Sequence, residues 1–355
     1  MARGSSFISA AGTRLTGRRL AGTVALCALA TLVVGGLAPL IGTDTTGGAW
    51  RHSLLPLDAY WRDTPDHVVL WLRLTRVLAC LVVGAALAGA GCALQALLRN
   101  PLAEPFTLGI SSGASLAAVV AIRLGAERVL GYGAIGAASL AGAALALGFV
   151  WQLGRIGRQL PPATLILAGV TVSMFCSSAS VLIQTTSDFS DVSHMLVWMV
   201  GGLDAVQLSA VEIGAPVIGV GLFVLIVYAR ELNALAAGPE SAASVGVAVA
   251  RTQSVVFVVA SLLVGVAISL VGPIGFIGLI VPHALRGVLG PDHRLLLPAS
   301  MLIGAAVLVG CDTVARAAIP LERLPTGAVT AVLGIPFFLA ILLRQKRSAA
   351  MWGRA

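Results

Sequence analysis

The chain contains 355 residues, of which 58% are hydrophobic and 11% are charged, and its mean hydropathy is +0.97. Soluble domains carry about 25% charged residues, so this composition excludes an ordinary soluble protein and predicts a membrane protein. The net charge of +8 is not gathered into a basic patch with interleaved aromatic residues, and we therefore expect no nucleic-acid partner.

Ten apolar segments are candidates to enter a lipid bilayer as helices. A helix needs about 20 apolar residues to cross the hydrocarbon core. The segments are 20–42, 70–98, 107–124, 130–152, 162–184, 208–229, 252–271, 275–288, 296–318 and 326–344. We predict an all-α integral membrane protein with a single transmembrane domain at 20–344, flanked by cytoplasmic tails at 1–19 and 345–355.

Positive charge predicts the orientation of these spans. Cytoplasmic loops of membrane proteins carry an excess of Lys and Arg. With ten spans and a cytoplasmic N-terminus, fifteen of the 23 basic residues fall on the cytoplasmic side and eight on the outer side. We therefore predict that both termini are cytoplasmic.

The N-terminus has a second interpretation. Arg18 and Arg19 precede an apolar run, as they would in a secretory or twin-arginine signal sequence. The run is longer than a typical signal core, and no secreted domain follows it. We favour a first helix that is retained in the membrane.

Three arginines lie at predicted outer ends of spans: Arg73 and Arg76 open the second span, and Arg316 closes the ninth. A guanidinium group held at the membrane edge can bind a partner's carboxylate in a bidentate manner. Arginine at a helix end is also an ordinary interfacial anchor. Arg316 follows Asp312 by four residues, so we predict that these two pair along one helix face and that Asp312 is a structural counter-ion.

Two apolar tracts are interrupted by proline and glycine. The first, 99–113, holds two prolines and two glycines between two spans, and the second is 271–283. Irregular backbone at membrane depth is tolerated only where protein or a water-filled cavity satisfies its hydrogen bonds. A pair of interrupted segments in the two halves of a chain is typical of a transport pathway.

The stretch 230–247 lies on the predicted cytoplasmic side. Gly238-Pro239 interrupts it, and Pro239–Ser244 is predicted to form a short helix with Glu240 in its first turn, where an acid is favourable. These residues alone fit an ordinary solvated connector and a contact site for another protein equally well.

Motifs for catalysis or metal binding do not accompany these segments. The five cysteines are isolated within apolar runs and the five histidines are scattered, so we expect no disulfide, metal site or cofactor. For His283 we favour a helix-terminus role. The sequence contains no GxxxxGK[ST] phosphate loop, so we expect a chain that is not an enzyme and does not hydrolyse ATP.

Six stretches carry a family resemblance. They are RNPLAEPFTLGISSGAS (99–115), LNALAAGPESAASVGV (232–247), GPIGFIGLIVPHALR (272–286), GPDHRLLLP (290–298), CDTVAR (311–316) and LPTGAVTAVLGIPFF (324–338). In sequence and order they closely resemble the permease subunits of ABC importers for iron-siderophores, haem and cobalamin, the FecCD and BtuC-like permeases. The similarity runs from about Arg73 to Arg344. It implies the type II importer permease fold and a multi-pass location in the inner or plasma membrane.

The resemblance also implies partners. These are two copies of an ABC ATPase subunit, a periplasmic or lipoprotein substrate-binding protein, and a second copy of this permease in a homodimer. The implied activity is ATP-driven import to the cytoplasm. A ferric siderophore is the expected cargo, with haem and cobalamin as alternatives.

Roles for individual residues follow from the same resemblance. It implies that the coupling loop is 230–250 and that the ATPase is contacted by Leu235, Gly238, Glu240, Ala243 and Gly246. It implies that Arg73, Arg76 and Arg316 dock the binding protein, although Thr75 stands where the family usually has proline. It implies a translocation path and inner gate that include Asn100, Pro101, Leu102, Pro161, Thr164, Thr171, Met174 and Ser178. For Met174 or any one serine alone, helix packing is the better interpretation.

Two other classes of function are alternatives to the importer permease. An ion-coupled secondary transporter would need carboxylates at the membrane midplane, and apart from Asp312 the acids lie near the predicted faces. An intramembrane hydrolase could be assembled only by combining Ser269, His283 and Asp312, which show no catalytic spacing. The importer permease is therefore the preferred interpretation, and the secondary transporter is its alternative.

Overall fold

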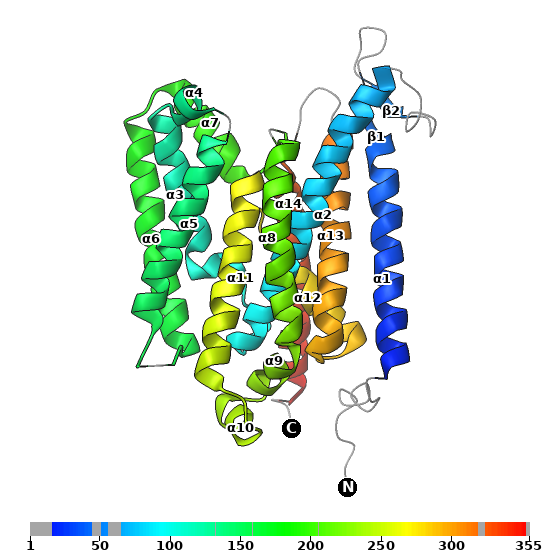
Figure 1. The fold of residues 1–355 in the computed structure, drawn as a ribbon, viewed down its shortest axis with the longest axis vertical. Helices are drawn as coiled ribbons and strands as arrows, with labels where there is room; N and C mark the ends of the chain where they lie inside the picture. Colours follow the sequence, from blue (N-terminus) through cyan, green and yellow to red (C-terminus); the bar gives the residue numbers. More distant parts are fainter. Residues whose placement is uncertain are drawn as a thin grey trace.

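The computed structural model describes residues 16–44, 51–55, 65–131, 133–157, 159–204, 206–318 and 324–352. Within these residues the chain is a bundle of long helices with one short β-hairpin (Figure 1). Of the predicted cytoplasmic tails, residues 1–15 and 353–355 lie outside the described part.

A helix occupies each of the predicted apolar segments. These helices are α1 (Gly17–Leu37), α2 (Pro65–Leu97), α3 (Ile110–Arg123), α5 (Ala134–Gly154), α6 (Pro162–Thr185), α8 (Leu208–Val227), α11 (Val249–Val271), α12 (Ile277–Leu289), α13 (His293–Ala318) and α14 (Thr326–Trp352). The last of them runs past residue 344, where the sequence predicted the span to end.

Seven of the described helices are long and apolar enough to cross a membrane. They are α1, α2, α5, α6, α8, α11 and α13. The apolar parts of α3, α12 and α14 are shorter, between 10 and 17 residues. The structure therefore agrees with an all-α membrane protein, and the prediction of ten complete spans goes beyond it.

Helix α2 is the centre of the bundle. Of the residues in its apolar window, 78% are buried, against 11% for α1. Helices α8, α11, α12 and α13 pack around it. Its second half is rich in alanine and glycine, which lets neighbouring backbones approach closely.

The connections between the long helices include several short elements. They are η1 (Ala38–Leu40), β1 (Ile41–Asp44), β2 (Arg51–Leu54), η3 (Pro105–Leu108), α4 (Ala126–Leu130), α7 (Phe189–Val200), α9 (Ala229–Ala236) and α10 (Pro239–Ser244). The antiparallel hairpin of β1 and β2 pairs Ile41 with Leu54 and Asp44 with Arg51. It was missed in the all-α prediction because its strands are short and lack an alternating apolar pattern.

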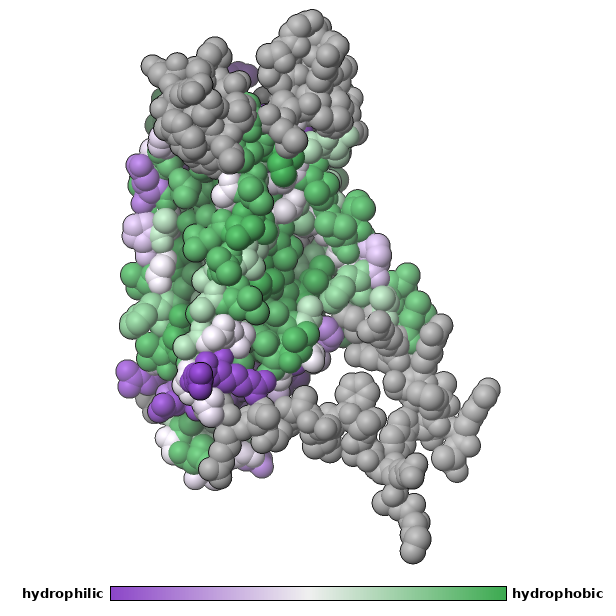
Figure 2. Space-filling model, turned by 90° about the vertical axis from the view of Figure 1, so that its right-hand side faces the viewer, coloured by the Kyte–Doolittle hydropathy of each residue, from purple (hydrophilic) through white to green (hydrophobic). Residues whose placement is uncertain are grey.

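The short elements divide the bundle into two ends (Figure 1). Helices α9 and α10 lie at one end, together with the beginning of α1, and we call it the α10 end. The β-hairpin, α4 and α7 lie at the other, which we call the hairpin end. Figure 2 shows hydrophobic residues over the middle of one face and hydrophilic residues gathered near the α10 end. This distribution is the one a bilayer requires.

Close helix packing depends on glycine at two crossings of α2. A Cβ atom added to Gly91 would overlap the backbone carbonyl of Gly278 in α12, and one added to Gly84 would lie 2.5 Å from the carbonyl oxygen of Gly304 in α13. The neighbours are backbone atoms, which cannot turn aside as a flexible side chain could. Gly84 and Gly91 are therefore contact points between α2 and its neighbours α13 and α12.

We expect Gly91→Val to destabilise the protein by about 1–3 kcal/mol or more, because the added side chain must push α12 away from α2. Gly148 in α5 is the matched control, since nothing lies within 4 Å of a Cβ at that position. Thermal unfolding of the purified variants in detergent measures the difference. Equal midpoints for Gly91→Val and Gly148→Val would contradict the packing described above.

Candidate functional site

A cluster of buried charges lies at the hairpin end, around Asp312 of α13. The Asp312 side chain is only 1% exposed, and it accepts hydrogen bonds from Arg76 Nη2 at 2.7 Å, Arg316 Nε at 2.9 Å and Thr326 Oγ1 at 3.0 Å. The pairing of Asp312 with Arg316 confirms the sequence prediction. The partners from α2 and α14 were not predicted, because nothing in the local sequence shows which distant helices meet.

The cluster also attaches the loops of the hairpin end to the helices. Arg76 Nη1 donates to Asp204 Oδ1 at 2.5 Å, and the Asp204 side chain is 37% exposed. Arg316 donates to the carbonyl oxygens of Ile41 and Ala38, at 3.1 and 3.2 Å. Arg73 Nη1 donates to the carbonyl of Pro39 at 3.1 Å.

The three arginines predicted to dock a binding protein therefore lie in one region and are largely buried. The exposed fraction is 6% for Arg73 as a whole, and 12% and 9% for the side chains of Arg76 and Arg316. All three guanidinium groups have partners inside the chain. Docking on these residues stays a prediction, and it would require the cluster to open.

The two interrupted tracts of the sequence meet in space. Glu104, between α2 and η3, accepts a hydrogen bond from the backbone N–H of Phe276 at 2.6 Å, just before α12 begins. Phe276 has φ +69°, a left-handed conformation that is uncommon for a bulky residue. The carboxylate thus satisfies a backbone donor at a turn that a regular helix could not make.

A second set of contacts joins the same tracts through Gln95 of α2. Its Nε2 lies 3.4 and 3.3 Å from the carbonyl oxygens of Gly278 and Leu279, and its Oε1 accepts from Arg286 Nη2 at 2.8 Å. We call Gln95, Glu104, Phe276 and Arg286 the tract joint. The sequence indicated that these tracts matter, but not that they bind each other.

The predicted gate turn at Asn100 is part of the same region. Asn100 Oδ1 accepts from the N–H of Leu102 at 3.0 Å, and its own N–H donates to the carbonyl of Gln95 at 3.1 Å. The imidazole of His283 in α12 lies near the backbone of Pro101. His283 also meets Phe337 of α14 edge to face, with ring centroids 6.5 Å apart.

The second predicted gate turn has different neighbours. Thr164 Oγ1 donates to the carbonyls of Gly154 and Pro161, at 2.6 and 2.9 Å, and so closes the turn between α5 and α6. Within the described residues no hydrogen bond links this turn to the Asn100 turn. Among the described residues, the two halves of the predicted inner gate therefore share no hydrogen bond in one chain.

One face of α6 carries the predicted path residues. Thr171, Met174 and Ser178 are all exposed and follow helical spacing, and the Thr171 hydroxyl donates to the carbonyl of Leu167 in its own helix. Exposed apolar residues continue this surface along the helix; among them are Leu167, Phe175, Val181 and Leu182. The face is free in a single chain and available to a pathway, a second copy or lipid.

At the α10 end the predicted short helix is confirmed, over Pro239–Ser244, with Glu240 in its first turn. Of the five residues assigned to ATPase contact, Glu240, Ala243 and Gly246 are exposed, whereas Leu235 and Gly238 are buried. Gly238 has φ +118° and Gly246 has φ +84°. Glycine is needed at both positions because it adopts positive φ without steric cost.

Helix α9 is fastened to the start of α13 by Asn233. The Asn233 amide donates to Asp292 Oδ1 at 2.8 Å, and its oxygen lies 2.8 Å from both the N–H and the Nδ1 of His293. Hydrogen bonds from Arg294 lower the pKa of Asp292 to about 2, against the opposing effect of burial. Asp292 is therefore ionised near neutral pH. Asn233 lies in the stretch 232–247, and Asp292 and His293 lie in the stretch 290–298. The sequence did not predict that these two stretches contact each other.

The hydrolase alternative finds no support in these contacts. The Ser269 hydroxyl donates to the carbonyl of Val266, His283 contacts Pro101 and Phe337, and Asp312 is held by two arginines and a threonine. The three side chains have separate partners, so they do not form a catalytic group.

Known proteins resemble this chain in sequence and in fold. Residues 24–344 match the model of the FecCD transport family. The chain is 42% identical over 296 residues to the cobalamin import system permease protein BtuC of Halobacterium salinarum, covering 83% of this chain and 78% of that protein. It is 39% identical to the vitamin B12 import system permease protein BtuC of Klebsiella pneumoniae, covering 81% of this chain and 86% of the relative.

A solved structure has the same arrangement of helices. It is an inward-facing conformation of a transporter assigned to the metal-chelate type of ABC transporter. The TM-score is 0.78 at 26% sequence identity, and the match covers 91% of this chain and 99% of that one. PsaBC from Streptococcus pneumoniae shares the fold at a TM-score of 0.55 and 17% identity.

Asp312 and Asp204 should contribute unequally to the stability of the protein. We expect Asp312→Ala to cost about 3–5 kcal/mol of stability, because two buried guanidinium groups lose their shared counter-ion. Asp204→Ala removes a more exposed partner of the same Arg76 and should cost less than about 1 kcal/mol. Thermal or denaturant unfolding in detergent compares them. Similar losses for both variants would contradict the assignment of Asp312 as the centre of the cluster.

Glu104→Ala should cost about 1–3 kcal/mol of stability, because the N–H of Phe276 is left without a partner. We expect Glu104→Gln to keep an acceptor for this N–H and to cost less. Unfolding midpoints of the purified variants in detergent measure both effects. Equal losses for the two variants would contradict the role of this side chain as the acceptor.

Proposed function

The chain belongs to the FecCD transport family, and on that premise we propose that it imports a metal-chelate substrate, moving it from the outer side to the cytoplasm in steps driven by a separate ATPase. Members of the family are permease subunits, and the ATPase activity sits on another chain. The observation that carries the proposal is α10, a short and mostly exposed helix at one end of a membrane bundle.

Helix α10 is the proposed contact for the ATPase. Glu240, Ala243 and Gly246 are exposed and would touch the partner. Leu235 and Gly238 are buried and would hold the helix in place instead of forming the contact. Two ATPase copies would serve two permease copies, one at each α10.

A movement of α10 has a defined route into the bundle. Helix α9 is attached to α13 through Asn233, and α13 packs against α2 and α12. The tract joint connects α2 with α12. A displacement of α10 would therefore be transmitted to the irregular backbone at 99–109 and 272–276. Packed elements that shift between two arrangements are the usual basis of alternating access.

The proposed topology has ten membrane spans with both termini in the cytoplasm. In Figure 1, the start of α1 and the end of α14 lie at the same end as α10. Helix α1 packs on α13, where Thr31 donates to the carbonyl of Leu302 at 2.8 Å, which supports a first helix retained in the membrane. The hairpin end would face the outer side, where a binding protein would approach Arg73, Arg76 and Arg316.

The proposed pathway lies between two copies of the chain. The exposed face of α6 with Thr171, Met174 and Ser178 would line it, and apolar and hydroxyl groups would let a large ligand leave again. The turns at Asn100–Leu102 and Pro161–Thr164 would contribute to its inner gate. Neither turn is completed by the other within one chain, so the gate would be assembled in the homodimer.

Cobalamin is the first candidate for the cargo. Two relatives that align with about four-fifths of this chain are named for cobalamin or vitamin B12 import. This reverses the order expected from the sequence, which placed a ferric siderophore first. Haem and ferric siderophores are the remaining candidates.

Reconstitution tests the function and the cargo together. The permease, its cognate ATPase and its binding protein are placed in proteoliposomes, and uptake of labelled cobalamin, haemin and a ferric siderophore is measured with and without ATP. We expect ATP-dependent uptake of cobalamin and a loss of at least tenfold in Glu240→Arg. Arg18→Glu reverses an exposed charge near the same end, on α1, and should leave uptake unchanged.

Uptake of haemin or a siderophore alone would replace cobalamin as the cargo and keep the importer. Uptake that does not depend on ATP but does depend on a proton gradient would overturn the importer in favour of an ion-coupled secondary transporter. The structure gives little support to that alternative, because Asp312, the acid expected at membrane depth, is fully engaged by Arg76, Arg316 and Thr326.

A further inference from the structure

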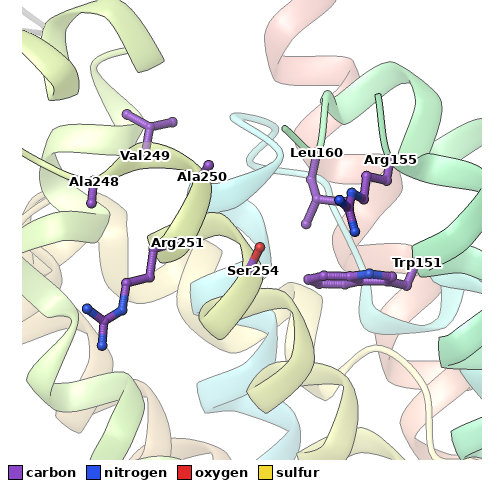
Figure 3. Close-up of a pocket in the computed structure, with 8 residues that line it drawn as sticks. All are labelled: Trp151, Arg155, Leu160, Ala248, Val249, Ala250, Arg251 and Ser254. Carbon is purple, nitrogen blue, oxygen red and sulfur yellow. The ribbon is translucent and has the colours of Figure 1, made fainter. Parts of the chain in front are cut away.

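A cavity of about 510 Å³ opens at the α10 end, between the last turn of α5 and the first turn of α11. Trp151, Arg155 and Leu160 line one side, and Arg251 and Ser254 line the other. Figure 3 shows the guanidinium group of Arg155 above the ring of Trp151, facing the side where Ser254 lies. None of the five residues assigned to the ATPase contact lines this cavity, although Ala248, Val249 and Ala250 at the end of the coupling loop do.

The lining is positively charged without internal compensation. The eight lining residues include two arginines and no acid. Arg155 Nε donates to the carbonyl of Gly157 at 2.5 Å, which fixes the side chain and leaves its terminal nitrogens without a hydrogen bond to the described residues. Arg251 is exposed and forms no ion pair within the described part of the chain.

The start of α11 adds to this positive potential. Its first turn contains Arg251 and no acid, and its N-cap residue Ala248 offers no side-chain acceptor. A cation beside the positive end of a helix dipole is unfavourable unless an anion lies close by. In Figure 3 the Arg251 side chain points away from the cavity, so it would turn inward when an anion binds.

An apolar surface continues from the cavity toward the middle of the bundle. Val258 and Leu262 of α11 are exposed by 39% and 43%, and they follow Ser254 at steps of four residues, on the same face of the helix. On the α5 side, Trp151 packs against the buried Phe257, with ring centroids 5.9 Å apart. Tryptophan is enriched where a membrane protein meets the headgroup region of the bilayer.

We propose that this cavity binds the headgroup of an anionic phospholipid. Arg155 contacts the phosphate first, Arg251 turns in to contact it from the other wall, and an acyl chain lies along Val258 and Leu262. Basic pockets between helices near a membrane surface suit this class of ligand. A free phosphate ion shares the charge but would gain nothing from the apolar surface, so we commit to the lipid. The proposal requires only that the bundle lies in a bilayer and is independent of the transported cargo.

Native mass spectrometry of the full chain, released from phosphatidylcholine nanodiscs doped with cardiolipin, tests the proposal. We expect retained cardiolipin to fall about tenfold in the double variant Arg155→Gln with Arg251→Gln. The single variant Arg18→Gln removes an exposed arginine from the first turn of α1 and should retain cardiolipin as wild type does. An independent variant, Ser254→Glu, leaves both arginines in place and should also lose the lipid through charge repulsion.

Inorganic phosphate is added to parallel samples to separate the two sources of the anion. Displacement of cardiolipin by millimolar phosphate would contradict the lipid assignment and indicate a phosphate site. Unchanged cardiolipin retention in both cavity variants would overturn the proposal. If those variants keep the lipid but no longer assemble with the ATPase, the cavity is a protein contact, which would also overturn it.

Discussion

The structure depends on the requirement that polar backbone inside a membrane be satisfied by the protein itself. The chain departs from helix at two places within its apolar core, and there each irregular tract becomes the partner of the other. Glu104 accepts from Phe276 at 2.6 Å, and Gln95 lies between α12 carbonyls and Arg286. Neither tract could keep its conformation alone in hydrocarbon, because an unsatisfied group there costs several kcal/mol. The tract joint is therefore a structural necessity of the fold.

Two polar attachments connect this joint to the ends of the bundle. At the α10 end, Asn233 fastens α9 to the start of α13. At the hairpin end, Asp312 gathers Arg76 of α2, Arg316 of α13 and Thr326 of α14. The same helix, α13, carries both attachments and packs along α2 between them. A force applied to α10 could thus reach the loops of the hairpin end through a single long helix, which is the arrangement expected of a permease whose energy source is another protein.

Under the proposed function, the arrangement would separate binding from passage. The charged groups of the cluster around Asp312 are occupied within the chain, and the exposed face of α6 offers apolar and hydroxyl groups with no fixed charge at Thr171, Met174 and Ser178. A surface of this kind would release a ligand readily, so selection of the cargo would rest with a binding protein. The basic cavity between α5 and α11 differs in kind, because its two arginines form no ion pair with the described residues, and a lipid headgroup would supply a counter-charge.

The sequence by itself determined the class of the protein and the positions of its elements. Apolar runs placed the helices to within a few residues, apart from the end of α14 at Trp352. Gly238-Pro239 predicted α10, and the spacing of Asp312 and Arg316 predicted their ion pair. Each of these features depends on neighbours within a few turns. Only the tertiary structure decided that Glu104 meets Phe276, that Arg76 shares Asp312, that Asn233 binds the start of α13, and that three arginines predicted to face a partner are largely buried. These contacts join residues between 59 and 236 positions apart. Their geometry follows from how whole helices pack, and no local pattern of side chains carries that information.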